Sequence, residues 1–211
     1  MNNSFDKLFD NSCVPKALKV NRSLSKEECR HIFSYMQERK PKMMLEFGVQ
    51  NGCSTRAFVE MAKWAKLNMT LHSWDIMDVL KCIGKNEFNF HLGDITGKER
   101  AVFDEYNPDF VFLDAHPYQL TKNIIEICLE RKIDFMCHDV VYPVGLQRTC
   151  ERTNGFSDLR VETNANWELF LLGTLIHTQL WHEDYYENNE LEVKCLREHN
   201  GLAIVRFKDN A

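Results

Sequence analysis

Several signals that would assign a function class at once are missing from this sequence of 211 residues. It has no run of about eighteen apolar residues, so no membrane span is expected. It has no block of Lys and Arg and its net charge is −5, so no nucleic-acid-binding face is expected. The first residues, MNNSFDKLFDNSC, lack the cationic and apolar segments of a secretion signal. We therefore expect a cytoplasmic protein whose partner is a small molecule.

Two further motifs are absent. None of the eight cysteines, at positions 13, 29, 53, 82, 128, 137, 150 and 195, forms a C-x-x-C pair. A zinc cage or a disulfide framework therefore has no local support, and buried free thiols in a reducing cytosol are predicted. The G-x-G-x-x-G turn of dinucleotide-binding proteins is also missing, which counts against NAD as a ligand.

What the sequence does contain is an alternation of apolar strands with amphipathic helices. Strands are predicted at 43–49, 70–75, 88–94, 108–116 and 133–140, with helices at 54–66, 98–106 and 118–131. Such alternation predicts right-handed crossovers and a parallel sheet. Before it, Ser25 and Glu28 have the spacing of a capping box, and a helical stripe of Cys29, Ile32, Phe33 and Met36 follows. This helix should pack on the main body.

The C-terminal part does not continue the alternation of strands and helices. Residues 167–175 (WELFLLGTL) and 201–207 (GLAIVRF) are predicted as strands that pair antiparallel at the sheet edge. The connection between them is long, and connections of that length are often functional or disordered. The predicted fold is a single three-layer α/β domain with a Rossmann-like, doubly wound, mostly parallel sheet and an antiparallel C-terminal edge hairpin.

Each of the five predicted parallel strands ends in a carboxylate or in a turn beside one. Ligands of open parallel sheets bind beyond the carboxyl ends of the strands, so these ends form the candidate site. They are Glu46 with the Gly48–Gly52 turn, then Asp75, Asp94, Asp114 with His116, and His138 with Asp139. Each also has a structural interpretation, because glycine pairs are common in turns and aspartates cap helices.

The segments MMLEFGVQNGCST, LHSWD, LGD and VFLDAHPY follow one another as the successive motifs of class I S-adenosylmethionine-dependent methyltransferases do. The sequence resembles this family over about residues 43–140. FLDAHPY and CHDVV are similar to the small-molecule O-methyltransferase branch that includes enzymes like macrocin O-methyltransferase and cephalosporin hydroxylase. The resemblance implies one methyltransferase domain over 1–211. Its parts would be a helical extension (1–41), a cofactor-binding core (43–140) and an insertion or lid (175–200).

The resemblance also implies which residues hold S-adenosylmethionine. A carboxylate at the end of the second strand is placed to accept hydrogen bonds from ribose hydroxyls, which is the role implied for Asp75. The turn of the first strand would line the methionine moiety, and the third strand end would flank the adenine. The implied cofactor-binding residues are Glu46, Gly48, Gly52, Ser54, Asp75, Asp94, Ile95 and Asp114.

In the same branch, carboxylates after the fourth and fifth strands bind a divalent cation, which matches Asp114 and Asp139. His138 stands where relatives often have Asp or Glu, and we include it as a ligand. Because Mg²⁺ prefers oxygen ligands, an imidazole there favours Mn²⁺ or Fe²⁺. Alternatively, His116 or His138 would act as a general base toward the acceptor hydroxyl.

The methyl acceptor is expected to be a small molecule, with a sugar or another polyhydroxylated metabolite suggested by the branch. Two other functions stay open at this point. One is a non-catalytic nucleotide-binding or assembly subunit with the same fold, and the other is an NAD-dependent enzyme. The oligomeric state is also open, with a homo-oligomer among the options.

Overall fold

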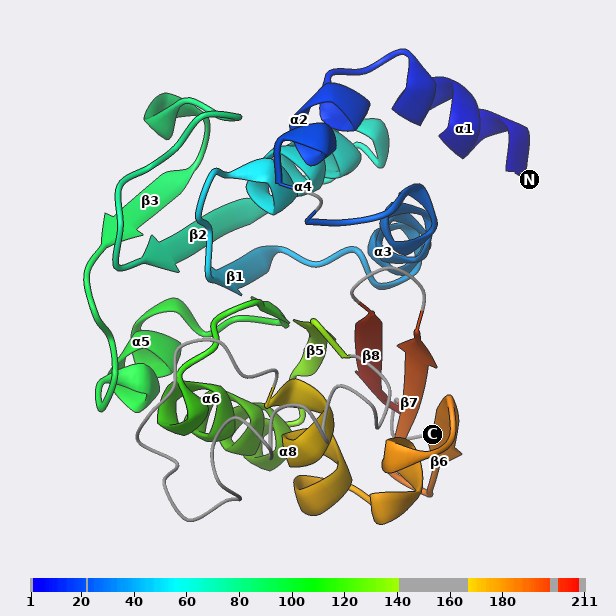
Figure 1. Ribbon diagram of the computed structural model, residues 1–211, viewed down its shortest axis with the longest axis vertical. Coiled ribbons are helices and arrows are strands. Elements are labelled where there is room, and N and C mark those ends of the chain that lie inside the picture. Colours follow the sequence, from blue (N-terminus) through cyan, green and yellow to red (C-terminus); the bar gives the residue numbers. More distant parts are fainter. Residues whose placement is uncertain (1, 22, 141–166, 198–200, 209–211) are drawn as a thin grey trace. The chain divides into compact units, whose positions relative to one another are not determined.

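The computed structural model describes residues 2–21, 23–140, 167–197 and 201–208. They form two compact units, Met1–Asp94 and Ile95–Ala211 (Figure 1). Residues 141–166, which include Cys150, lie outside the described part of the chain. Among the residues described, no helix combines the length and hydrophobicity needed to cross a bilayer.

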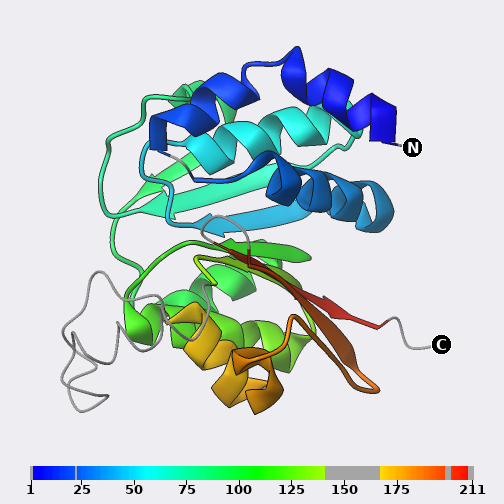
Figure 2. The same cartoon turned by 45° about the vertical axis from the view of Figure 1, so that its right-hand side comes forward.

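The first unit is a parallel layer of strands with its helices along one side. Its strand order is β3-β2-β1, with Met43 opposite Thr70 and His72 opposite Asn89. Figure 2 shows α2, α3 and α4 on the same side of the strands. The elements are α1 (Asn2–Asp10), α2 (Val14–Asn21), α3 (Lys26–Arg39), β1 (Met43–Phe47), α4 (Cys53–Trp64), β2 (Thr70–Asp75), the 3₁₀ turn η1 (Lys85–Glu87) and β3 (Asn89–Leu92).

Helix α3 begins at the predicted capping box. The Ser25 hydroxyl accepts a hydrogen bond from the Glu28 backbone N–H (3.1 Å), and the Glu28 carboxylate accepts one from the Ser25 backbone N–H (2.6 Å). These two bonds satisfy N–H groups that a helix start otherwise leaves unpaired. The predicted stripe is buried, and the helix is capped at its C-terminal end by Lys40, whose φ of 51° is left-handed.

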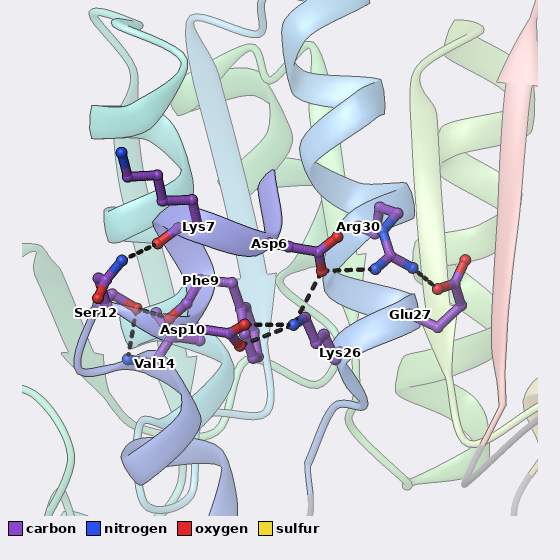
Figure 3. Close-up of polar contacts among 10 residues, drawn as sticks. Asp6, Lys7, Phe9, Asp10, Ser12, Val14, Lys26, Glu27 and Arg30 are labelled. Atoms are coloured by element: carbon purple, nitrogen blue, oxygen red, sulfur yellow. Dashed lines mark hydrogen bonds and ion pairs between the residues drawn. The ribbon is translucent and has the colours of Figure 1, made fainter. Parts of the chain in front are cut away.

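No individual element was predicted within residues 1–24 of the implied helical extension (1–41), and the structure places α1 and α2 there. Figure 3 shows how α1 is held against α3 by charged side chains. Asp6 pairs with Lys26 and with Arg30, both at 2.9 Å, and Asp10 pairs with Lys26 at 2.8 Å. The Phe5 ring of α1 also packs 5.5 Å from the ring of Phe33. Because these ion pairs are partly exposed, the buried rings contribute more to holding α1 than the charges do.

The second unit has the strand order β4-β5-β8-β7-β6. β4 and β5 are parallel, with Phe110 opposite Asp134, whereas β8 runs antiparallel to β5. Its elements are α5 (Glu99–Tyr106), β4 (Phe110–Leu113), α6 (Tyr118–Arg131), β5 (Asp134–His138), α8 (Glu168–Leu175), η3 (Thr178–Trp181), β6 (Tyr185–Glu187), β7 (Leu191–Leu196) and β8 (Leu202–Phe207).

The predicted antiparallel C-terminal hairpin is present, but one of its two predicted strands was wrong. Residues 168–175 form helix α8, and β8 pairs instead with β7, with Leu191 opposite Phe207. A short continuous apolar run fits a buried helix as well as a buried strand, so periodicity could not separate the two. Strands β6 and β7 lie in the segment predicted as an insertion or lid, so part of that segment belongs to the sheet.

Each cysteine within the described ranges is a free thiol, and five of the seven are buried. Burial raises the pKa of Cys53 to about 12 and that of Cys195 to about 11, so both stay protonated at neutral pH. The prediction of buried free thiols is therefore confirmed for these residues.

Candidate cofactor and metal sites

The turn after β1 needs glycine at its last position for two independent reasons. Gly52 has a φ of +75°, in the left-handed region that side chains disfavour. A Cβ added there would lie 2.6 Å from Cγ2 of Ile83. Helix α4 begins at the next residue, so its unpaired backbone N–H groups and the positive end of its dipole belong to this turn. The turn can therefore receive an anionic or polar group close to the backbone.

Glu46 holds the start of helix α4, which follows this turn, through hydrogen bonds. Its side chain is fully buried and accepts hydrogen bonds from the hydroxyls of Ser54 (2.6 Å), Thr55 (2.7 Å) and Ser73 (2.7 Å). One carboxylate thus joins β1 to the first turn of α4 and to β2. Ser54 was predicted as a site residue but Thr55 and Ser73 were not, because hydroxyl residues are too common in sequences to stand out. The predicted contact of Glu46 with the methionine moiety stays a prediction.

Asp75, at the end of β2, holds the same turn through hydrogen bonds to its backbone. Its Oδ2 accepts hydrogen bonds from the backbone N–H groups of Val49 (2.9 Å) and Gln50 (2.7 Å), and Oδ1 accepts one from Met77 (2.8 Å). This carboxylate therefore positions the loop, and its predicted role as ribose acceptor stays a prediction. Leu92 is opposite Asp75 in the β2–β3 register and is 60% exposed.

Asp94 and Ile95, predicted to flank the adenine, follow Gly93 at the boundary of the two units. Asp94 is exposed and ends the first unit, whereas Ile95 is buried and begins the second. Their predicted role is not decided by these positions and stays a prediction.

In the second unit, the ends of the neighbouring strands β4 and β5 bring acidic and imidazole groups together. One ligand atom each from Asp114, His116 and Asp139 all lie within 4.8 Å of one another. His138 is buried, and its Nδ1 lies 3.1 Å from Oδ1 of Asp114 and 3.3 Å from Oδ1 of Asp139. Because parallel neighbouring strands end at the same edge, residues 24 or 25 positions apart in the sequence meet here.

His116 lies between two carboxylates. Its Nε2 is 3.6 Å from Oδ2 of Asp139, and its Nδ1 is 3.6 Å from Oε1 of Glu168. The Glu168 carboxylate is the main cause that raises the pKa of His116 to about 9. Burial in turn raises the pKa of Glu168 to about 7. Glu168 was not predicted as a site residue because residues 167–175 were assigned to a strand. An acidic residue inside an apolar run was the signal that could have indicated it.

No protein-family model matches this sequence, and no curated protein matches it. Solved structures do match over nearly the whole chain. The O-methyltransferase from Bacillus cereus in complex with SAH has a TM-score of 0.61 and 14% identity, covering 96% of this chain and 96% of that chain. The SAH-bound methyltransferase PaMTH1 of Podospora anserina has a TM-score of 0.55 and 17% identity, covering 97% and 93%. The chain has the fold of these methyltransferases.

A third match is a structure of CmcI with Mg and SAM, which has a TM-score of 0.53 and 14% identity, covering 88% of this chain and 72% of that chain. The methyltransferase fold agrees with the predicted fold class, a Rossmann-like α/β arrangement that is mostly parallel with an antiparallel C-terminal hairpin. At these identities the matches establish the fold, and the chemistry must be argued from this chain's own residues.

The second unit of this methyltransferase fold offers a donor set that fits a divalent cation. Two carboxylates and one imidazole, from Asp114, Asp139 and His116, are each partly accessible. Oxygen donors suit Mg²⁺ and Mn²⁺, and the imidazole favours Mn²⁺ or Fe²⁺. His116 supplies a ligand atom to this group, and Nδ1 of the buried His138 lies beside both carboxylates. The assignment of His138 as a ligand stays a prediction.

Proposed function

We propose that this chain is an S-adenosylmethionine-dependent methyltransferase that methylates a hydroxyl of a small molecule with the help of a divalent cation. The observation that carries the proposal is the cation-competent group of Asp114, His116 and Asp139 in a chain with the methyltransferase fold. The matching structures support the cofactor, because two are complexes with SAH and the third is a complex with Mg and SAM. The buried free thiols favour the cytoplasm as its location.

The first unit would bind the cofactor. The glycine turn, held by Glu46 and Asp75, would receive the methionine end at the start of α4, next to Ser54. Asp75 would accept hydrogen bonds from the ribose hydroxyls, as expected for an acid at the end of β2. The exposed side chain of Leu92, in register with Asp75, would offer an apolar surface to the adenine. Asp94 and Ile95 would flank the adenine.

The chemistry needs alignment first and deprotonation second. A sulfonium methyl group is already activated, so holding the acceptor oxygen in line with it accounts for much of the rate. When bound, a divalent cation would lower the pKa of the acceptor hydroxyl. Asp114, His116 and Asp139 would hold that cation, and Nδ1 of His138, hydrogen-bonded to Asp114 and 3.3 Å from Asp139, would help to fix the two carboxylates.

The raised pKa of His116 favours the cation route over the histidine-base route. With a pKa of about 9, the metal-free imidazole carries a proton at neutral pH and cannot accept another. His138 is buried against the two carboxylates and is not accessible to an acceptor. An acceptor with neighbouring hydroxyls, such as a sugar or another polyhydroxylated metabolite, would suit a cation with open coordination positions.

Calorimetric titration with S-adenosylmethionine, SAH and NAD⁺ tests the cofactor assignment. We expect both sulfur compounds to bind and NAD⁺ not to bind. Absence of binding by either sulfur compound at millimolar concentration would refute the methyltransferase proposal. Binding of NAD⁺ alone would point to an oxidoreductase instead. Binding of the sulfur compounds without release of SAH from any hydroxylated acceptor would favour a non-catalytic subunit.

Two single substitutions test how the roles are divided. Asp75→Ala should mainly weaken SAH binding, whereas Asp114→Ala should abolish methyl transfer and leave SAH affinity nearly unchanged. Asp109→Ala, which changes an exposed aspartate just before β4, is the control. EDTA should suppress turnover, and Mn²⁺ or Mg²⁺ should restore it. The opposite order of effects, or full activity in the chelator, would show that these roles are wrongly assigned.

A further inference from the structure

Glu168 is a buried acid that nothing in the cofactor site explains. It is the first residue of α8, and its side chain is fully buried. Neither carboxylate oxygen has a hydrogen-bond partner within the described ranges. Burying a carboxylate without such partners is costly, so a position like this one is retained only where another group compensates the charge.

Two features compensate the buried charge of Glu168. The Nδ1 of His116 lies 3.6 Å from Oε1 of Glu168, close enough for an ion pair. The position at the start of α8 also places the carboxylate at the positive end of the helix dipole. Beside it, the Trp167 ring packs edge-on against Tyr118, with centroids 5.2 Å apart. Because its side chain is fully buried, the Glu168 carboxylate is shielded from water, and it faces Nδ1 of His116.

His116 therefore has a different partner on each ring nitrogen. Nδ1 faces Glu168, and Nε2 faces Asp139 in the cation-competent group. A neutral imidazole has one N–H donor and one lone pair. If Nδ1 carries the proton toward Glu168, the lone pair is fixed on Nε2, on the side where a cation would be held. Glu168 itself is outside the group of atoms that lie within 4.8 Å of one another.

We propose that Glu168 is a positioning residue that orients His116 for cation binding, by holding its Nδ1–H and leaving Nε2 as the ligand atom. This inference rests on the metal site of the proposed function. A carboxylate behind a metal-binding histidine fixes the ring and raises its basicity, and losing it typically weakens metal binding about 10–100-fold.

The test is calorimetric titration of the metal-free chain with Mn²⁺. Glu168→Gln keeps the shape of the side chain and removes its charge, and it should weaken Mn²⁺ binding about 10–100-fold. Glu99→Gln is a matched control in the same unit. Glu99 is also buried, also begins a helix, and accepts a hydrogen bond from Asn123 (3.1 Å). The Glu99→Gln variant should bind Mn²⁺ with the affinity of the wild-type chain.

If Glu168 acts through His116, its effect on Mn²⁺ binding should disappear when His116 is removed. In a His116→Ala background, Glu168→Gln should cause no additional loss of Mn²⁺ affinity. Equal losses in both backgrounds would overturn the proposal, because Glu168 would then act directly or through general destabilisation. Unchanged Mn²⁺ affinity of Glu168→Gln would overturn it as well.

If Glu168→Gln does not fold, Glu168→Asp replaces it. Its shorter side chain keeps the charge, and weakened Mn²⁺ binding with unchanged melting in EDTA is the result expected.

SAH titration of the same proteins separates this inference from the proposed function. Glu168→Gln should bind SAH as the wild-type chain does. A wild-type chain that binds Mn²⁺ but not SAH would refute the methyltransferase proposal and leave the role of Glu168 standing. A wild-type chain that binds SAH but not Mn²⁺ would overturn the role of Glu168 and leave the cofactor assignment standing.

Discussion

Replacing Glu46 with alanine tests whether the turn after β1 is held by a buried charge. The substitution removes the acceptor shared by the hydroxyls of Ser54, Thr55 and Ser73, at 2.6 to 2.7 Å. All four residues are buried, so water does not replace the lost bonds. We expect loss of stability together with weaker SAH binding, because Ser54 and Thr55 belong to the first turn of α4.

The magnitude follows from the three hydroxyls. Leaving a buried donor without an acceptor costs about 1–3 kcal/mol. Two effects reduce the total. Serine and threonine hydroxyls on a helix can instead hydrogen-bond to a carbonyl one turn earlier, and removing the carboxylate also removes the cost of burying its charge. We therefore expect a loss of roughly 3–5 kcal/mol in the free energy of unfolding. For a chain of this size that corresponds to a Tm lower by roughly 6–20 °C.

Urea unfolding of the cofactor-free chain, followed by circular dichroism, measures this loss. Glu130→Ala is the matched control, because Glu130 accepts two hydrogen bonds from Arg100, at 3.1 and 2.6 Å. Both of these side chains are more than half exposed, so that change should cost much less stability than Glu46→Ala. Equal losses in the two variants would refute the reasoning, since burial would then contribute nothing to the Glu46 cluster.

Three other outcomes are expected. Gly52→Ala should lower stability by about 1–3 kcal/mol more than Gly97→Ala in urea unfolding, because both glycines have positive φ but only the Cβ at Gly52 would clash. Gly173→Ala should destabilise the chain although alanine favours helices, since its Cβ would lie 1.7 Å from Nε1 of Trp181; a stability gain in the same assay would contradict this packing. Mn²⁺ affinity should rise with pH, by up to about tenfold per unit below pH 9, because the pKa of His116 is raised to about 9 and the cation must displace its proton. A flat calorimetric profile from pH 6.5 to 8.5 would remove His116 from the ligand set.

The strand–helix alternation and the individual helix starts could be predicted from the sequence because their causes are local. The capping box of Ser25 and Glu28 and the apolar stripe behind it involve residues within two turns of one another. Helix α6 begins and ends where its pattern predicts. The carboxylates at the strand ends were also predictable, because a parallel sheet fixes which end of each strand carries a ligand.

Only the tertiary structure decided which distant residues meet. The apolar run 168–175 is equally compatible with a strand, and in the structure it is a helix while β7 pairs with β8. That placement buries Glu168 opposite His116, although the two residues are 52 positions apart in the sequence. Likewise, the proximity of His116 to both Asp114 and Asp139 in the cation-competent group is visible only in the structure. Such choices depend on packing and charge in three dimensions, and no local pattern in the sequence records them.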